Sequence, residues 1–248
     1  VRIFNENLLG MQVDPFEARA DVYCITALSV SAGRAKFLAS QFKKIYPSSL
    51  VVVGGIHASL MPEEFTDAAD HVVVGEAENI IIDIVEGKFQ EKIITGTRVE
   101  DLDSLPLVNY RLLEGYENLK IVPIMTSRGC PFRCNFCSVT KIFGHTYRMQ
   151  SPRRILEEIE NILTYFKNKG FFFYDDNLTA DKKRISELCD LLAGKGYDIR
   201  WTAQVRADLA KDPELILNMA RAGLKWVYIG FESINDETLK VLKKSQTR

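Results

Sequence analysis

Residues 121–137 read Ile121-Val-Pro-Ile-Met-Thr-Ser-Arg-Gly-Cys130-Pro-Phe-Arg-Cys134-Asn-Phe-Cys137, a short apolar run followed closely by three cysteines. The run at 121–125 predicts a β-strand, which places the cysteines in the loop at the carboxyl end of that strand. In α/β proteins this end of the sheet faces the active site. The stretch therefore predicts an α/β fold in which three thiols lie where the chemistry takes place.

The chain after this stretch repeats a strand followed by a helix. Further strands are predicted at 170–174, 199–204 and 226–231. Ser151-Pro152 and Asp212-Pro213 mark the starts of two helices, and Gly223 marks the end of the second. About four parallel strands are too few to close a barrel. We expect residues 120–248 to form either an open sheet or a barrel that is incomplete at its carboxyl-terminal end.

The same alternation precedes the cysteine stretch. Strands are predicted at 22–28, 50–53 and 72–74, and helices at 35–46 and 76–86. This pattern predicts a parallel sheet with helices on its faces, so we interpret residues 1–95 as a Rossmann-like domain. Between 96 and 119 the periodicity fails and Pro106 interrupts an acidic stretch, which is typical of an ordered connector.

Composition limits the classes of partner. The 248 residues include 32 Lys and Arg against 33 Asp and Glu, a formal net charge of −1, so no broad attraction to nucleic acid is expected. The apolar fraction of 46% is enough to fill real cores. There is no apolar run of the roughly 18–20 residues that span a bilayer, and no signal-peptide pattern. We therefore expect a cytoplasmic protein without a membrane span.

The five cysteines are unevenly distributed. Cys130, Cys134 and Cys137 lie within eight residues, whereas Cys24 and Cys189 stand alone on apolar segments and are interpreted as buried core thiols. Three thiolates can hold an iron–sulfur cluster and leave one iron without a protein ligand, whereas a structural zinc site has four closed positions. The alternative is a three-cysteine zinc loop completed by His145.

The C-x3-C-x2-C loop resembles that of the radical S-adenosylmethionine (SAM) superfamily. The segments Cys137-Ser-Val-Thr-Lys-Ile-Phe-Gly-His-Thr-Tyr-Arg, Phe173-Tyr-Asp-Asp-Asn and Gly230-Phe-Glu-Ser resemble the branch with an amino-terminal cobalamin-binding domain. The resemblance covers nearly the whole chain. It implies a partial barrel with about four of about six strands, a [4Fe–4S] cluster on Cys130, Cys134 and Cys137, and SAM chelating the fourth iron. It also implies a low-potential electron donor such as flavodoxin or ferredoxin.

The resemblance further implies a set of SAM contacts at the strand ends: Phe136, Asp175, Asp176, Asn177, Gln204, Arg206 and Glu232. The family's usual Gly-Gly-Glu is replaced here by Asp175-Asp176-Asn177, which leaves open which of the three binds the amino group of SAM. The alternatives are structural. Asn177 would cap the next helix together with Thr179, Arg206 would form a surface salt bridge, and Glu232 would cap a helix together with Ser233.

For cobalamin, the resemblance implies contacts to the nucleotide tail from Thr26, Leu28 and Ser29 after one strand and from Gly54 and Gly55 after the next. Glycine lets the backbone approach a large flat ligand closely. The family's Asp-x-His-x-x-Gly element is absent, as is the first strand–helix unit that would carry it. His57 and His71 are interpreted as a loop residue and a strand-edge residue rather than as cobalt ligands.

These features lead to a first hypothesis: reductive cleavage of SAM to a 5′-deoxyadenosyl radical, with cobalamin-dependent C-methyl transfer to a small-molecule or peptide substrate. A second enzymatic hypothesis drops cobalamin and performs rearrangement, cyclisation or sulfur insertion. The non-enzymatic alternatives are a metal-stabilised binding module and an inactive fragment of a longer enzyme.

Overall fold

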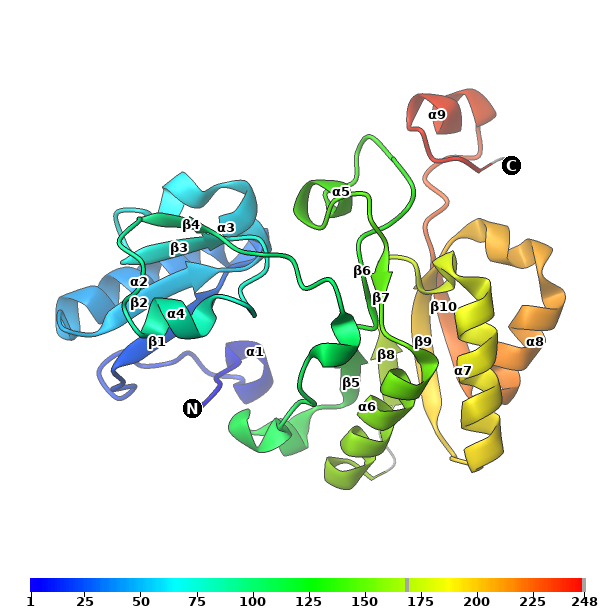
Figure 1. The fold of residues 1–248 in the computed structure, drawn as a ribbon, viewed down its shortest axis with the longest axis horizontal. Coiled ribbons are helices and arrows are strands. Elements are labelled where there is room, and N and C mark those ends of the chain that lie inside the picture. The colour runs from blue at the N-terminus through cyan, green and yellow to red at the C-terminus, as the bar shows by residue number, and fades with distance from the viewer. Residues whose placement is uncertain (168–169, 247–248) are drawn as a thin grey trace. The chain divides into compact units, whose positions relative to one another are not determined.

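A computed structural model describes residues 1–167 and 170–246 of the chain. It divides into two compact units, one formed by Met11–Glu100 and the other by Val1–Gly10 together with Asp101–Arg248 (Figure 1). Both units are built on parallel sheets, as the alternation of strands and helices predicts. Among the described residues, no helix is long and apolar enough to cross a membrane.

The unit of residues 11–100 contains one four-stranded parallel sheet of order β1-β2-β3-β4. Its strands are β1 (Val22–Thr26), β2 (Leu50–Gly54), β3 (His71–Val74) and β4 (Ile93–Thr95). Its helices are α2 (Ala32–Ile45), α3 (Ile56–Leu60) and α4 (Ile81–Val85), with 3-10 turns at Ser29–Ser31 and Pro62–Phe65. The helix expected at 76–86 is thus shorter, because Glu76 turns inward and accepts a hydrogen bond from the Val99 backbone.

Alternate side chains of this sheet fill two separate cores. Val51 and Val53 pack on one face with residues of α2, whereas Val52 packs on the other with Ile84 of α4. The expectation of a buried Cys24 is wrong, because its side chain is exposed. Cys24 pairs in register with Val52, but the core on that face contains buried residues of β2, β3 and β4 and none of β1.

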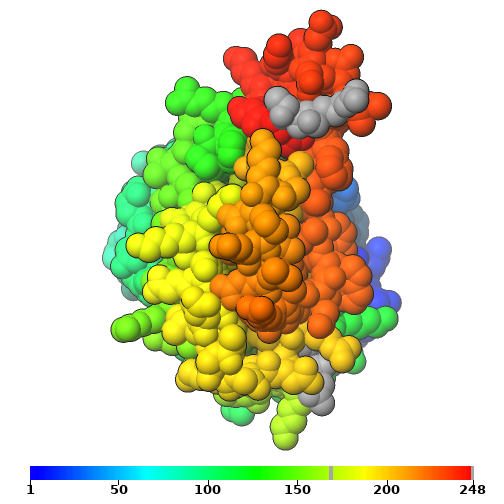
Figure 2. Space-filling model, turned by 90° about the vertical axis from the view of Figure 1, so that its right-hand side faces the viewer, coloured from blue at the N-terminus to red at the C-terminus, as the bar shows by residue number. Residues whose placement is uncertain are grey.

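The second unit contains a four-stranded parallel sheet of order β10-β9-β8-β5. Its strands are β5 (Ile121–Ile124), β8 (Gly170–Phe173), β9 (Arg200–Val205) and β10 (Leu224–Ile229). Its longer helices are α6 (Pro152–Tyr165), α7 (Lys182–Lys195) and α8 (Pro213–Arg221), of which α7 and α8 lie side by side in Figure 2. The predicted partial barrel is therefore seen as an open sheet with β10 at its edge.

Shorter elements complete this unit. They are the helices α1 (Glu6–Leu9), α5 (Val139–Ile142) and α9 (Asp236–Val241), the strands β6 (Ser127–Arg128) and β7 (Arg148–Met149), and 3-10 turns at Leu102–Ser104, Tyr110–Leu112, Tyr116–Asn118, Leu178–Ala180 and Ala207–Lys211. The predicted helix signals are confirmed. Ser151 and Asp212 accept hydrogen bonds at the starts of α6 and α8, and Gly223 follows α8 with a φ of +105°.

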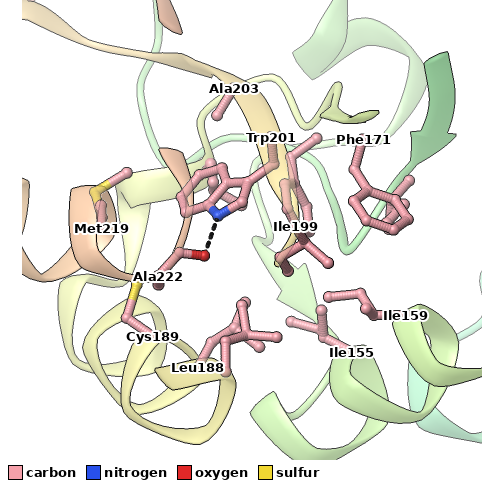
Figure 3. Packing of buried hydrophobic residues seen from close by; sticks show 14 of the residues in the cluster. Ile155, Ile159, Phe171, Leu188, Cys189, Ile199, Trp201, Ala203, Met219 and Ala222 are labelled. Carbon is pink, nitrogen blue, oxygen red and sulfur yellow. Dashed lines mark hydrogen bonds between the residues drawn. The ribbon is translucent and has the colours of Figure 1, made fainter. Parts of the chain in front are cut away.

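The core of the second unit lies between the sheet and its helices (Figure 3). Trp201 of β9 donates from its ring nitrogen to the carbonyl of Ala222, 2.8 Å away, which ties the end of α8 to the sheet. Cys189 of α7 is fully buried in this core, as predicted, and burial raises the pKa of its thiol to about 12. It is a packing residue with a suppressed thiolate.

The segment 96–119, expected to be a connector, packs largely on the second unit. Tyr110 is buried edge-on against Phe166, 5.0 Å between ring centroids, and Arg154 donates to the carbonyl of Leu105. Ile3 pairs with Leu113, which adds the first residues of the chain to the same unit. The chain passes from one compact unit to the other near residues 10 and 100, and the domain limits of 95 and 119 stay a prediction from hydrophobic periodicity.

Candidate active site

The three clustered cysteines lie on a loop of residues 129–147, which we call the cluster loop. The antiparallel pair β6 and β7 closes its two ends, with Ser127 opposite Met149 and Arg128 opposite Arg148. Gly129 begins the loop with a φ of +85°, and a Cβ there would collide with the carbonyl oxygen of Thr146. Only glycine permits both the backbone conformation and the close approach.

Asp175, at the end of β8, anchors the base of this loop. Its Oδ1 accepts hydrogen bonds from the Thr126 amide and hydroxyl, both at 3.0 Å, and from the Ser127 hydroxyl. The side chain is buried, which raises its pKa, whereas these donors and Arg184 lower it. Asp175 thus points into the protein and fixes the two residues that lead into the loop.

Arg184 of α7 braces the same base from the other side. Its guanidinium donates to the carbonyls of Thr126 and Gln150 and to the hydroxyl of Tyr147. The two ends of the cluster loop are therefore joined by one buried cation. Sequence reasoning missed this role, although Arg184 directly precedes Ile185 on an apolar stripe and lies one turn before Leu188, which is a signal for a buried arginine.

The three thiols share one region of the loop. Cys130, Cys134 and Cys137 are each partly exposed, and the amide of Cys137 donates to the carbonyl of Cys134 at 3.2 Å. Burial is the largest cause that raises the pKa of the Cys130 thiol, and the nearby Cys137 and Asp176 raise it further. Loading with iron must deprotonate these thiols.

Among the described residues, no three His, Cys, Asp or Glu side chains are gathered around a common point as one metal ion requires. A structural zinc site needs four such donors at one ion, and His145, the proposed fourth ligand, is exposed. In an iron–sulfur cubane, each cysteine binds a different iron, so the thiols need not converge on a single point. Three partly exposed thiols on one closed loop fit such a cluster.

The two residues after Asp175 differ in exposure. Asp176 is solvent-accessible and lies near Cys130; partial desolvation and the neighbouring Asp175 raise its pKa to about 6. Asn177 is buried, and its side chain makes no capping hydrogen bond to the following turn. Helix α7 is instead capped by Asp181, which accepts from the amide of Arg184 at 2.9 Å, so the capping alternative for Asn177 is wrong.

Gln204 and Arg206 mark the carboxyl end of β9. Gln204 donates to the carbonyl of Tyr174 at 3.3 Å. Arg206 is buried, its guanidinium stacks 3.7 Å from the ring centroid of Phe132 on the cluster loop, and it donates to the carbonyls of Lys244 and Ser245. It also pairs with Asp208 at 3.2 Å. Arg206 thus joins the cluster loop to the segment after α9.

Glu232 follows β10 with a φ of +61°, which is uncommon for a residue with a side chain. Its carboxylate accepts from the Lys244 ammonium at 2.9 Å, and Asn235 rather than Glu232 caps α9. The same ammonium lies 5.7 Å from the ring centroid of Phe136, which is half exposed on the cluster loop. The structure therefore brings Phe136 and Glu232 to one place through a shared cation.

A second candidate site lies at the carboxyl end of the sheet in the unit of residues 11–100. Gly55 has a φ of +95°, and a Cβ there would lie 2.5 Å from Thr26 Oγ1. Ser59 donates to the carbonyl of Gly55 and accepts from the amide of Gly75, so it fixes the ends of β2 and β3. Glycine at position 55 therefore permits the close packing of the chain after β2 against Thr26 and Ala27.

The rim of this edge is apolar. Leu28 and Val30 expose 48% and 96% of their surface on the turn after β1, and Ile56 exposes 38% on α3. Ser29 is exposed between Leu28 and Val30, and Gly54 ends β2. These exposed apolar side chains offer a surface on which a large, mostly apolar ligand can pack.

The structure is thus a two-unit α/β protein. One parallel sheet carries a three-cysteine loop of the kind that binds an iron–sulfur cluster, and the other carries glycines at its carboxyl edge. The chain belongs to the radical SAM superfamily, whose family model matches residues 124–248. The family model of the B12 binding domain matches residues 11–85. The two families give the chain its cofactors: a [4Fe–4S] cluster and SAM for the second unit, and cobalamin for the first.

Two relatives are similar to this chain over most of its length. Bacteriochlorophyllide d C-8(2)-methyltransferase of Chlorobaculum tepidum is 32% identical over 92% of this chain and 53% of its own length. The anaerobic magnesium-protoporphyrin IX monomethyl ester cyclase of Cereibacter sphaeroides is 27% identical, over 93% and 43% respectively. The chain thus spans about half the length of these relatives.

A solved structure shares the fold. The cobalamin-dependent radical SAM enzyme OxsB, with aqua-cobalamin and SAM bound, aligns with a TM-score of 0.78 at 20% identity, over 94% of this chain and 38% of that chain. The predicted recognition of the family and the predicted α/β fold class are confirmed.

Proposed function

We propose that this chain carries the radical-generating part of a cobalamin-dependent C-methyltransferase. The observation that supports this most directly is the closed three-cysteine loop at the carboxyl end of β5, in a chain whose other unit matches a B12 binding domain. When bound and reduced, the cluster supplies the electron that splits SAM into methionine and a 5′-deoxyadenosyl radical. The rest of the proposal concerns what the side chains hold.

Cys130, Cys134 and Cys137 hold the cluster in this proposal, and Asp175 and Arg184 keep their loop in place. Because Asp175 is buried and committed to Thr126 and Ser127, and because Asn177 is buried too, we assign the amino group of SAM to the accessible Asp176. An ammonium donates three hydrogen bonds, and a carboxylate is its natural acceptor.

The other proposed SAM contacts are Phe136, Gln204 and Glu232, which lie at the cluster loop and at the ends of β9 and β10. Arg206 contributes by holding the ring of Phe132 and the carbonyls of residues 244 and 245. A low-potential donor of the flavodoxin or ferredoxin type supplies the electron, and a reducing cytoplasm keeps the thiols available for iron.

The test separates the two aspartates after anaerobic reconstitution with iron and sulfide. Asp176→Ala is expected to keep the cluster absorbance but to weaken SAM binding, roughly tenfold for one charged hydrogen bond. Asp175→Ala is expected to lower cluster occupancy, because the base of the loop loses its acceptor. No cluster, and no 5′-deoxyadenosine from the reduced wild-type chain with SAM, would overturn the proposed function.

The cyclase relative favours a second candidate, a ring-forming reaction without methyl transfer. The two candidate functions differ in the products that form from SAM when cob(I)alamin is bound. With cobalamin bound, a methyltransferase would use SAM as a methyl donor and release S-adenosylhomocysteine, whereas a cyclase would yield 5′-deoxyadenosine without S-adenosylhomocysteine. Methylcobalamin absorbance and S-adenosylhomocysteine, measured after adding SAM to the cob(I)alamin-loaded chain, distinguish them.

A further inference from the structure

His57, on the short helix α3, has both of its ring nitrogens engaged. Nδ1 lies 3.0 Å from the hydroxyl oxygen of Ser29, and Nε2 lies 3.1 Å from a carboxylate oxygen of Glu64. The ring also packs edge-on against the buried Phe65, with 6.0 Å between centroids. The His57 side chain is only 15% exposed, compared with 50% for Glu64, so the ring is held firmly on a surface.

The positions of the protons in these two hydrogen bonds can be argued from the groups that only accept. A carboxylate can only accept, so Nε2 of His57 carries a proton and donates to Glu64. When Nε2 carries the only ring proton, Nδ1 is an acceptor, and the hydroxyl of Ser29 donates to it. The Ser29 hydroxyl, which would otherwise rotate, is fixed with its oxygen lone pairs turned away from His57.

Ser29 is exposed between the apolar residues Leu28 and Val30 on the turn that follows β1. The backbone couples this turn to α3, because the amide of His57 donates to the carbonyl of Ala27 at 2.8 Å. A ligand bound at this edge therefore contacts the Ser29 hydroxyl, whose orientation is set by its hydrogen bond to His57.

We propose that His57, braced by Glu64, is a positioning residue that fixes the Ser29 hydroxyl as a hydrogen-bond acceptor for cobalamin. The proposal rests on the assignment of cobalamin to this edge. Cobalamin carries amide N–H and ribose O–H donors, which match the outward lone pairs of Ser29. The hydroxyl is already ordered in the unbound protein, so binding loses less conformational entropy and the affinity for cobalamin is higher.

The test is a set of cobalamin affinities, measured by absorbance titration of the whole chain. His57→Phe keeps a ring against Phe65 but removes both nitrogens, and we expect it to weaken binding roughly tenfold, about as much as Ser29→Ala. The double variant should bind no more weakly than either single variant, because His57 acts only through Ser29. His57→Asn, whose amide oxygen can replace Nδ1 as the acceptor, should recover part of the loss.

A matched pair of substitutions tests the role of Glu64 in holding His57. Glu64→Ala, which removes the acceptor of Nε2, should weaken cobalamin binding, whereas Glu63→Ala, the same change on the adjacent exposed residue, should not. Wild-type affinity in His57→Phe, or losses that add in the double variant, would overturn the positioning role alone. Failure of the wild-type chain to bind cobalamin would overturn both this role and the cobalamin assignment, while leaving cluster formation intact.

One spectroscopic outcome also decides against the proposal. If His57 were a cobalt ligand, the cob(II)alamin form of the ¹⁵N-labelled chain would show splitting from a protein nitrogen in electron paramagnetic resonance, and His57→Asn would abolish it. We expect no such splitting, because cobalt binding would require His57 to give up one of its two contacts.

Discussion

At the residue scale, the cysteines of the cluster loop and the isolated cysteines have separable roles. We expect Cys130→Ala, Cys134→Ala or Cys137→Ala to lose most of the iron and the cluster absorbance after reconstitution, because each removes one of three protein ligands. Cys24→Ala is the control, since Cys24 is exposed in the other unit. Iron bound equally by the Cys24 and Cys137 variants would contradict the assignment of the cluster loop.

Glu158 of α6 gives a pH-dependent prediction at the same scale. Burial raises its pKa above the usual value, against the opposing effect of Arg154. Because the folded-state pKa is raised, the charged form costs stability, and this cost grows as the pH rises through the folded pKa. Glu158→Gln should therefore raise the denaturant midpoint at pH 8, and the gain should shrink near pH 4.

The matched control for that change is Glu157→Gln, on the adjacent residue, whose side chain is 60% exposed. Its effect on the denaturant midpoint should be small at both pH values, since exposed charges contribute little. A loss of stability in Glu158→Gln at pH 8 would show that the ion pair with Arg154 outweighs the cost of burial.

At the element scale, we expect the same substitution at two glycines of the second unit to have opposite effects on stability. Gly223 turns the chain from α8 into β10 at a φ of +105°, and an added Cβ would collide with the carbonyl of Ile199. Gly223→Ala should destabilise the protein by more than about 1 kcal/mol. Gly194, in the last turn of α7, has open space around it, so Gly194→Ala should stabilise by about 0.5–1 kcal/mol.

Urea denaturation followed by circular dichroism measures both glycine variants. Equal effects of the two substitutions would mean that helix propensity alone, and not the left-handed turn, decides the cost at Gly223. The comparison matters for the site, because the turn at Gly223 sets the start of the strand that ends near Glu232.

At the scale of the whole molecule, the two compact units should respond separately to core substitutions. Ile84 lies in the core of residues 11–100 and Ile159 in the core of the second unit, and both are fully buried. Each change to alanine should cost about 2–5 kcal/mol in its own unit. Hydrogen exchange measured by peptide should show lost protection in 11–100 for Ile84→Ala and in 121–229 for Ile159→Ala. Equal losses everywhere would mean that the units unfold together.

The sequence alone determined the α/β class and the order of the strands along the chain, and it predicts the cysteine ligands. Local patterns carry these features: apolar runs mark the strands, Ser151 and Asp212 mark helix starts, and the spacing of Cys130, Cys134 and Cys137 is a motif in itself. The limits of the two compact units are harder to predict from the sequence, because Tyr110 and Ile3 join the second unit through contacts with residues distant in sequence.

Only the tertiary structure decided which groups support the site. The commitment of Asp175 to Thr126 and Ser127, the brace from Arg184 and the contacts of His57 with Ser29 and Glu64 join separate elements that no local pattern links. Cys24 was placed wrongly for the same reason: strand periodicity assigns a side chain to a face of the sheet, but packing between elements decides whether that face is covered.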